Sequence, residues 1–423
     1  MHLSSGINFP EIPVNEFKLD NGLKVLIIED HSLPLVSYCT FYKVGTRNER
    51  KGITGISHFL EHMMFNGTKK YGPKIFDILI ESNGGYSNAC TSPDMTVYYQ
   101  EFPKDVLDSI VELESDRMTN LVFEPVILES ERKVILEERS SSIENYPPGK
   151  LEEELFSLAY EEHPYSWPVI GLREDIESIS QEDLMNYYHS FYCPNNAVIV
   201  ISGDIYSNDV LPIIKKFYEH IPPFELNTNS LKLPSIKKEK RKEISHKVEI
   251  PSFMSAYLCS SVKSKDIFVL DLIDTILAYG KSSRLYQKLI EEKSMAIKIS
   301  VDFSWKLDPS LFIFYIQMSS NYSNYDGEEV IYEELNKIKK EGISIDELNK
   351  AKNIHIVDFL RSFKKNISRA HLIGQSEILF GDWKKIFSLI EEYMRITEDD
   401  VLEVINKYFF DENRTVVHMV PRS

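Results

Sequence analysis

Hydrophobic and polar positions follow two different periods along the first part of the chain, which predicts a mixture of strands and helices. Short apolar or alternating runs predict strands at residues 23–29, 36–44, 85–91 and 96–102, with Pro93 and Asp94 turning between the last two. Apolar positions at helical spacing predict helices at residues 55–66, 74–82, 104–121 and 125–143. Strand pairs followed by helix pairs favour an α+β fold, with an antiparallel-rich sheet covered by helices on one face.

The same order of elements returns in the second part of the chain, and two segments repeat each other. Residues 181–205 and 398–421 both contain an acidic first turn, an amphipathic helix, an aromatic pair, a polar turn and an apolar strand. Asp183 aligns with Asp400, and Asn196 aligns with Asn413, at an offset of 217 (400 − 183). A repeat at that offset predicts two homologous halves of about 200 residues each.

The boundary between the halves is expected near residues 223–245. Pro222 and Pro223 end the first half, and a polar stretch then leads into the charge run KKEKRK at residues 237–242. Such a composition is typical of a solvated linker. We therefore predict an N-terminal domain at residues 1–222, a linker at residues 223–245 and a homologous C-terminal domain at residues 246–423.

Composition narrows the range of functions. The 423 residues have globular composition, with 43% hydrophobic and 27% charged residues, and the net charge of −17 argues against nucleic acid as a partner. A basic or extended peptide is compatible with this acidic charge, although the charge could equally serve solubility alone. The four cysteines are isolated from one another, so a zinc–thiolate site is not expected.

The sequence contains no recognisable membrane or export segment. No run of 18 apolar residues predicts a membrane span, and the first ten residues lack the basic and apolar regions of a signal peptide. We expect a cytoplasmic protein or the processed form of a periplasmic one, and the scattered cysteines do not decide between the two.

The segment GISHFLEHMMF at residues 55–65 holds the arrangement with the clearest chemistry. On a helix, His58 and His62 lie one turn apart on one face, where two imidazoles can reach one Zn²⁺. Glu61 lies on the same side and can act on water without being a ligand. The surrounding apolar residues indicate a buried helix, and buried His and Glu side chains need partners that a metal would provide. A chance motif on a solvated salt-bridge face is the alternative.

A catalytic zinc ion takes three protein ligands and keeps one open position, so a third ligand must come from elsewhere in the chain. Glu131 and Glu138, in the stretch ESERKVILEER, lie two helical turns apart and so on one face of a predicted helix. One carboxylate could bind the metal while the other accepts the free N–H of a liganding imidazole. The two glutamates alone do not decide between these roles, and an exposed acidic helix explains their spacing at least as well.

These motifs resemble the pitrilysin family of zinc peptidases, also called the insulinase or inverzincin family, in which HxxEH replaces the commoner HExxH. Seventy-six positions separate His62 from Glu138, the spacing of that family's third ligand, and Glu131 matches a supporting glutamate. The resemblance also covers Gly84-Gly85, Asn88-Ala89, Thr91, Thr96-Val97-Tyr98, His163-Pro164-Tyr165, Pro168-Val169-Ile170-Gly171 and Ser282-Ser283-Arg284-Leu285. The chain length fits the bacterial two-domain subfamily related to mitochondrial processing peptidase subunits.

The resemblance implies a zinc metalloendopeptidase. Zn²⁺ would be held by His58, His62 and Glu138, with Glu61 as general base and Glu131 supporting catalysis. The family fold implies two α+β domains, of which the second carries no zinc site because it has no HxxEH near residue 275. Two chains would form a clam-shaped chamber, and a peptide substrate would add as a strand to the edge formed by Gly85, Asn88, Ala89, Cys90 and Thr91.

The chain departs from the family at the substrate grip of the second half. Active members carry an Arg and, seven residues later, a Tyr, whereas the aligned residues here are Ile290 and Ile297. Neither can donate a hydrogen bond to a peptide carbonyl, although a register shifted by a turn would offer Arg284 and Tyr286. The resemblance therefore favours a heterodimer over a homodimer, with a homologous partner supplying the Arg and Tyr. The alternatives are a non-catalytic assembly or core subunit and a metal-binding module without turnover.

Overall fold

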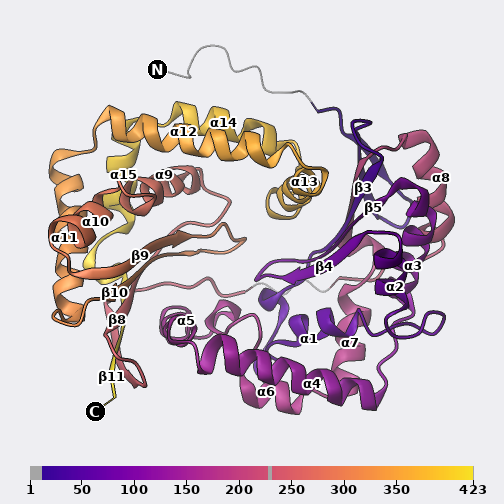
Figure 1. Cartoon of the computed structure of the whole chain (residues 1–423), viewed down its shortest axis with the longest axis horizontal. Coiled ribbons are helices and arrows are strands. Elements are labelled where there is room, and N and C mark those ends of the chain that lie inside the picture. Colours follow the sequence, from indigo (N-terminus) through magenta and orange to yellow (C-terminus); the bar gives the residue numbers. More distant parts are fainter. Residues whose placement is uncertain (1–11, 227–230, 423) are drawn as a thin grey trace.

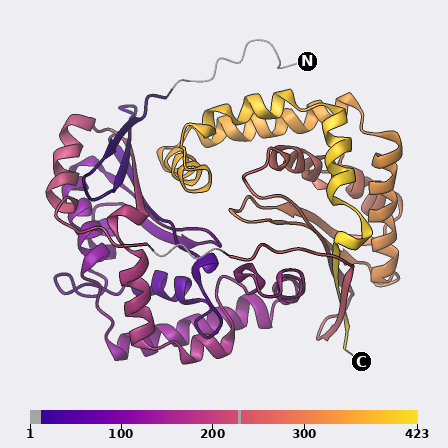
Figure 2. The same ribbon diagram turned by 180° about the vertical axis from the view of Figure 1, so that it is seen from behind.

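The computed structural model describes residues 12–226 and 231–422, which form two β-sheets flanked by helices (Figure 1, and from behind in Figure 2). The first sheet has the order β1-β2-β6-β3-β5-β4, from β1 (Asn15–Lys18), β2 (Lys24–Glu29), β3 (Leu35–Tyr42), β4 (Tyr86–Thr91), β5 (Thr96–Pro103) and β6 (Ala197–Gly203). The second has the order β7-β11-β8-β10-β9, from β7 (Lys240–His246), β8 (Ser252–Leu258), β9 (Ala296–Phe303), β10 (Leu311–Met318) and β11 (Arg414–Pro421).

The helices fall into two corresponding sets. The first half contains α1 (Ile56–Met63), α2 (Ile75–Ser82), α3 (Leu107–Thr119), α4 (Pro125–Arg139), α5 (Pro147–Tyr160), α6 (Arg173–Ser178), α7 (Gln181–Phe191) and α8 (Ser207–Tyr218). The second half contains α9 (Asp266–Ala278), α10 (Arg284–Tyr286), α11 (Asn324–Glu341), α12 (Ile345–Ser362), α13 (Asn366–Phe380), α14 (Lys385–Arg395) and α15 (Glu398–Tyr408).

The two sheets share one topology once β1 is set aside. β6 runs parallel to β2 and antiparallel to β3, just as β11 runs parallel to β7 and antiparallel to β8. The repeated segments form α7–β6 and α15–β11, and capping boxes at Ser180 and Thr397 begin the two helices. The prediction of an α+β fold with two homologous, antiparallel-rich sheets is confirmed.

The second sheet takes in residues that were expected to be linker. β7 occupies Lys240–His246, so it includes the last six residues of the stretch 223–245, and it pairs in parallel with β11. Most of its side chains remain in solvent, and Arg241 is paired with Glu328 of α11. A charge run suits an edge strand as well as it suits a linker, because charged side chains are common on exposed sheet edges.

Each sheet buries one of its faces against a helix from the other half. α13 lies against β3 and β6 of the first sheet, while α5 lies against β8 and β11 of the second, an arrangement that can be followed in Figure 1. Leu26, Phe41 and Val200 of the first sheet belong to one apolar cluster with Ala370 and Ile373 of α13. The sequence predicted helices on one face of each sheet. The structure adds a further helix, α13 or α5, on the opposite face.

Close packing and ion pairs hold α13 in place. Lys24 Nζ lies 2.7 Å from Glu377 Oε1, and Arg369 Nη2 lies 3.0 Å from Asp30 Oδ2. At Gly374 a Cβ atom would lie 2.1 Å from the Phe41 ring. The helix therefore approaches the sheet at a distance that only glycine permits.

A second contact between the halves involves the loop after β9. Asp308 accepts a hydrogen bond from Arg47 Nε at 2.6 Å, and His163 Nε2 lies 3.2 Å from the same carboxylate. The Leu307 N–H donates to Asp94 Oδ2 at 2.9 Å. These contacts fix the segment 304–310 of the second half against the first half.

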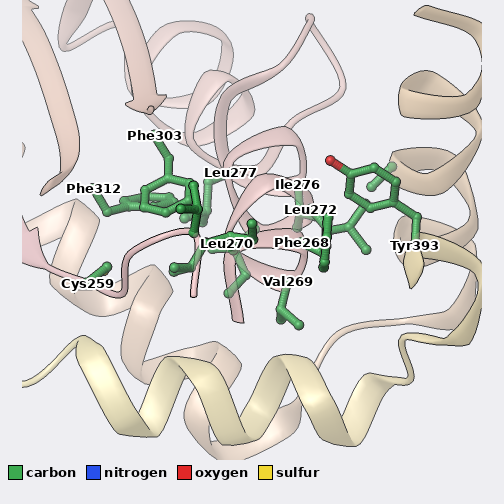
Figure 3. Packing of buried hydrophobic residues seen from close by; sticks show 14 of the residues in the cluster. Cys259, Phe268, Val269, Leu270, Leu272, Ile276, Leu277, Phe303, Phe312 and Tyr393 are labelled. Atoms are coloured by element: carbon green, nitrogen blue, oxygen red, sulfur yellow. The ribbon is translucent and has the colours of Figure 1, made fainter. Parts of the chain in front are cut away.

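The core of the second half is built around α9, which is apolar on almost every side. Phe268, Leu272 and Ile276 of this helix are buried near Tyr393 of α14 (Figure 3). A helix that is apolar all round needs packing partners on all sides, which the sheet and α14 provide. Within residues 12–226 and 231–422, no helix is long and apolar enough to cross a membrane.

We expect Gly374→Ala to lower the free energy of unfolding by about 1–3 kcal/mol, because the added methyl group overpacks the contact with Phe41. The better helix propensity of alanine would offset only about 0.5–1 kcal/mol of this loss. Urea unfolding followed by circular dichroism measures the difference. Gly72→Ala is the matched control, since nothing lies within 4 Å of its added atom. Equal stability of the two variants would contradict the close approach of α13.

Candidate metal centre

The helix that carries the HxxEH motif, α1, begins without a side-chain cap of its own. Gly55 occupies the N-cap position with φ of 82°, and a Cβ there would lie 2.3 Å from the carbonyl oxygen of Ile170. Gly171 lies in close contact with Gly55, so the segment 168–171 packs directly against the start of the helix. This close approach requires glycine at both positions.

The carboxylate of Glu49 replaces the missing cap. Glu49 is 5% exposed and accepts hydrogen bonds from the N–H groups of Gly55 (2.8 Å) and Ser57 (3.0 Å) and from the indole of Trp167 (2.9 Å). Burial raises the pKa of Glu49, while these hydrogen bonds oppose the change. An acid at this position satisfies the first N–H groups of α1 and thereby fixes the orientation of the helix.

The packing of α1 against α4 brings two histidines and one glutamate together. His58 Nε2 lies 3.7 Å from Glu138 Oε1, and His62 Nε2 lies 3.5 Å from Glu138 Oε2. One ligand atom from each residue lies within 4.8 Å of the others, and the described part of the chain contains no second group of this kind. α4 is held at this position by the buried Arg139, whose Nη1 donates to the carbonyl of Gly171 at 2.7 Å.

These three side chains fit a divalent cation better than they fit one another. Two imidazoles and a carboxylate are a ligand set of catalytic zinc sites, and the separations are too long for direct hydrogen bonds. His62 Nδ1 lies 3.2 Å from Glu131 Oε2, which leaves Nε2 free for a cation. The buried Nδ1 of His58 has no hydrogen-bond partner among residues 12–226 and 231–422. A cation bound at Nε2 would give this imidazole a strong interaction.

The two imidazoles differ in their charge. Burial and the neighbouring His62 lower the pKa of His58 to about 4. Burial also disfavours the charged form of His62, but the hydrogen bond with Glu131 and the nearby carboxylate of Glu138 raise its pKa to about 9. The neighbouring His62 in turn lowers the pKa values of Glu131 and Glu138. The two carboxylates therefore supply the negative charge that a divalent cation requires.

Glu61 lies beside this cluster and points towards β4. Its carboxylate accepts a hydrogen bond from the hydroxyl of Thr91 and is not among the three converging ligands. Burial raises the pKa of Glu61, and the hydrogen bond from Thr91 opposes this rise. A carboxylate whose pKa is raised is well suited to accept a proton close to a cation site.

β4 forms the edge of the first sheet, and its outer side has no strand partner within the described residues. The residues predicted to bind substrate lie along it, with Gly85 directly before the strand and Asn88, Ala89, Cys90 and Thr91 within it. The Ala89 N–H donates to the side chain of Asn88 at 2.8 Å. Cys90 is an exposed free thiol. The edge is therefore open to an added strand.

The counterparts of the family's Arg and Tyr lie in the second half. Ile290 packs against the apolar core, while Ile297, near the start of β9, is 59% exposed. Arg284, which a shifted register would offer, donates to Glu347 through Nε at 2.6 Å and through Nη2 at 2.9 Å. This guanidinium is thus engaged within its own half.

His58, His62 and Glu138, which converge here, were all predicted from the sequence, whereas Glu49 and Trp167 were not. α1 starts at Gly55 instead of at a Ser, Asp or Asn, so its first N–H groups require another acceptor. Glu49 is the nearest preceding carboxylate, and Trp167 directly precedes the segment 168–171. The absence of a normal cap was therefore a usable signal for Glu49.

Comparison with known families classifies the chain. Residues 24–172 match the family described as Insulinase (Peptidase family M16), and residues 178–354 match the Peptidase M16 inactive domain. The chain belongs to the M16 peptidase family, and the resemblance to the insulinase, or pitrilysin, family is confirmed.

Individual relatives are similar over nearly the whole chain. The zinc protease PqqE of Helicobacter pylori is 30% identical over 410 residues, covering 95% of this chain and 92% of that protein. The uncharacterized zinc protease YmxG of Bacillus subtilis is 25% identical over 404 residues, covering 94% of this chain and 96% of that protein. The crystal structure of a protease from Helicobacter pylori aligns with a TM-score of 0.93 at 28% identity, covering 97% of this chain and 100% of that one.

We expect Glu49→Gln to weaken zinc binding by about 10–100-fold, a range typical for partners that support metal ligands, because α1 loses its charged acceptor. Competition with a chromophoric chelator measures this affinity. Glu182→Gln, an exposed change on α7, is the control and should bind zinc as the unchanged chain does. Unaltered affinity in a folded Glu49→Gln chain would show that Glu49 does not position the ligands.

Proposed function

We propose that this chain is a zinc metalloendopeptidase in which His58, His62 and Glu138 hold Zn²⁺ and Glu61 acts as general base. The observation that carries the proposal is the convergence of three ligand atoms beside Glu61, which is itself hydrogen-bonded to the edge strand β4. The zinc centre would belong to the N-terminal domain, proposed at residues 1–222. The relatives named as zinc proteases support the same assignment.

The chain's own residues account for the proton transfers of peptide hydrolysis. Bound Zn²⁺ would act as a Lewis acid that lowers the pKa of water and polarises a peptide carbonyl. Glu61 would take a proton from the attacking water and pass it to the leaving amine nitrogen. Its raised pKa suits this role, since a stronger base accepts the proton more readily. Glu131 would hold the Nδ1–H of His62 and so keep the imidazole in the correct tautomer.

The substrate would be an extended peptide paired with the outer edge of β4, along Gly85 and the stretch 88–91. Strand addition relies on main-chain hydrogen bonds and therefore gives affinity with little selection among side chains. Thr91 connects binding with catalysis, because its hydroxyl contacts Glu61 while its main chain belongs to the edge. Peptides and unfolded segments suit such a site, since they have strands free to pair.

We infer that the chain acts as the catalytic subunit of a heterodimer. Ile290 and Ile297 offer no hydrogen-bond donor in their side chains, and Arg284 is engaged with Glu347. A homologous partner would supply the missing Arg and Tyr across a clam-shaped chamber. The same isoleucines favour a second candidate, a non-catalytic core or assembly subunit. The intact ligand set together with Glu61 supports the catalytic assignment.

Glu61→Gln should retain zinc and lower peptide hydrolysis by about 10²–10⁴-fold, because the proton acceptor is removed while the ligands remain. The measurement is hydrolysis of an extended quenched-fluorescence peptide, with zinc content determined on the same sample. Glu137→Gln, an exposed change beside the ligand Glu138, is the control. Full activity of Glu61→Gln would contradict the assignment of the base. Turnover by the chain alone would contradict the heterodimer, whereas zinc without turnover would support it.

His58→Ala should lose bound zinc, because two remaining protein ligands are fewer than a catalytic site uses. Elemental analysis of the purified chain measures the zinc content. His189→Ala, at an exposed position on α7, is the matched control and should keep its metal. Normal zinc content in His58→Ala would place the metal elsewhere.

A further inference from the structure

Lys306 is a buried cation at the boundary between the halves. It follows β9, is 8% exposed, and extends towards aromatic side chains of the first half. Its Nζ lies 5.1 Å from the ring centroid of Phe156, 5.9 Å from that of Tyr160 and 5.2 Å from that of Tyr165. Aromatic faces stabilise an ammonium group electrostatically, so the cage offsets part of the cost of burial.

The ammonium group has no acceptor from the protein. Across residues 12–226 and 231–422, no hydrogen-bond acceptor contacts Lys306 Nζ, and no carboxylate lies within 4.0 Å of it. Asp94, a buried acid nearby, already accepts hydrogen bonds from the Tyr165 hydroxyl (2.5 Å) and the Leu307 N–H (2.9 Å). Burial lowers the pKa of Lys306, and Asp94, Asp302 and Glu152 oppose that change from farther away.

Two adjoining cavities meet at this side chain. One, of about 260 Å³, is lined mainly by apolar side chains, among them Phe156, Trp167 and Val169. The other, of about 550 Å³, is bounded by the β4–β5 turn at residues 92–95 and by the β9–β10 loop. Lys306, Glu152 and Phe156 line both. An apolar space thus has a cation with three unused donors at its mouth.

The cavities lie where a peptide on β4 would continue. Residues 92–95 directly follow Thr91, the last residue of the edge strand and the partner of Glu61. Ser142 and Ile143, on the wall of the smaller cavity, follow the helix that carries Glu138. A side chain or chain end of a peptide extending beyond Thr91 would therefore reach Lys306.

We propose that Lys306 and the cavities around it form a specificity pocket for a carboxylate of the substrate, supplied by an Asp or Glu side chain or by the peptide's C-terminus. The proposal rests on the peptidase function proposed above. A carboxylate here would give Lys306 the charge-assisted hydrogen bonds that it lacks, and the apolar wall would receive the methylene groups of the ligand.

Among the described residues that line the two cavities, Lys306 is the one cation, beside the acids Asp94, Glu152, Glu153 and Asp302. Glu152 and Asp302 are exposed and so can be hydrated. Glu153, on the smaller cavity, is already paired with Arg139 and Lys150. A solvated carboxylate gains little from a partner, whereas a buried ammonium gains much. Selection should therefore act through Lys306.

The test measures how tightly a series of extended peptides binds to the zinc-loaded Glu61→Gln chain. This binding measurement needs no turnover. Each peptide carries Glu, Gln or Lys at one scanned position and ends in a free carboxylate or an amide. We expect one position at which the peptide with Glu binds about tenfold more tightly than the peptide with Gln, or a similar loss of affinity when the C-terminus is amidated. One charge-assisted hydrogen bond would give a difference of this size. The first result identifies a side-chain carboxylate and the second a chain terminus. Fluorescence anisotropy reports the affinities.

Lys306→Met should abolish this preference, whereas Lys306→Arg should retain it. Lys298→Met, at an exposed position on β9, is the matched control. A preference for Lys, no preference for a carboxylate, or a preference that survives in Lys306→Met would overturn the proposal. If Lys306→Met fails to fold, the affinities of the parent chain for the peptide series alone decide whether the pocket prefers a carboxylate. Selective binding by a parent chain that retains no zinc would contradict the peptidase function and leave the pocket standing.

Discussion

The reciprocal packing of α5 and α13 is the constraint on which the rest of the structure depends. Each half contributes one helix to the open face of the other half's sheet, so neither sheet is fully covered by its own half. Burial of apolar surface is the main stabilising contribution in folding, and here much of that surface is shared. The two halves therefore behave as parts of one folded unit even though each repeats the same topology.

This exchange connects the second half to the candidate metal centre, although none of the three converging side chains comes from the second half. Its sheet packs against α5, and Glu153 of α5 is paired with Arg139 at the end of α4. Arg139 directly follows Glu138 and also binds the carbonyl of Gly171, which packs against the start of α1. Support for His58, His62 and Glu138 thus extends from the second sheet through α5 to α1 and α4. Metal sites need such support because ligand positions must be accurate to fractions of an ångström.

The sequence predicted what local spacing and periodicity can encode. The HxxEH motif placed His58 and His62 on one helix face, the repeat between residues 181–205 and 398–421 predicted the paired topology, and the family spacing selected Glu138. Contacts between residues far apart in the chain left no local pattern. The hydrogen bond from Trp167 to Glu49 joins residues more than one hundred positions apart. The sequence pattern of α5 and α13 would be the same if each helix packed within its own half. The charge run at residues 237–242 was ambiguous because an exposed edge strand and a linker are both polar.

The position of α13 also has a consequence for synthesis on the ribosome. The strands of the first sheet are complete at Gly203, yet the helix that covers one of its faces starts only at Asn366. At roughly 5–20 residues per second, the intervening chain takes on the order of ten to thirty seconds to emerge. During that interval Leu26, Phe41 and Val200 have no cover from α13, and exposed apolar sheet surface of this kind promotes aggregation. The nascent chain therefore has a defined window in which a chaperone that recognises apolar strands would bind.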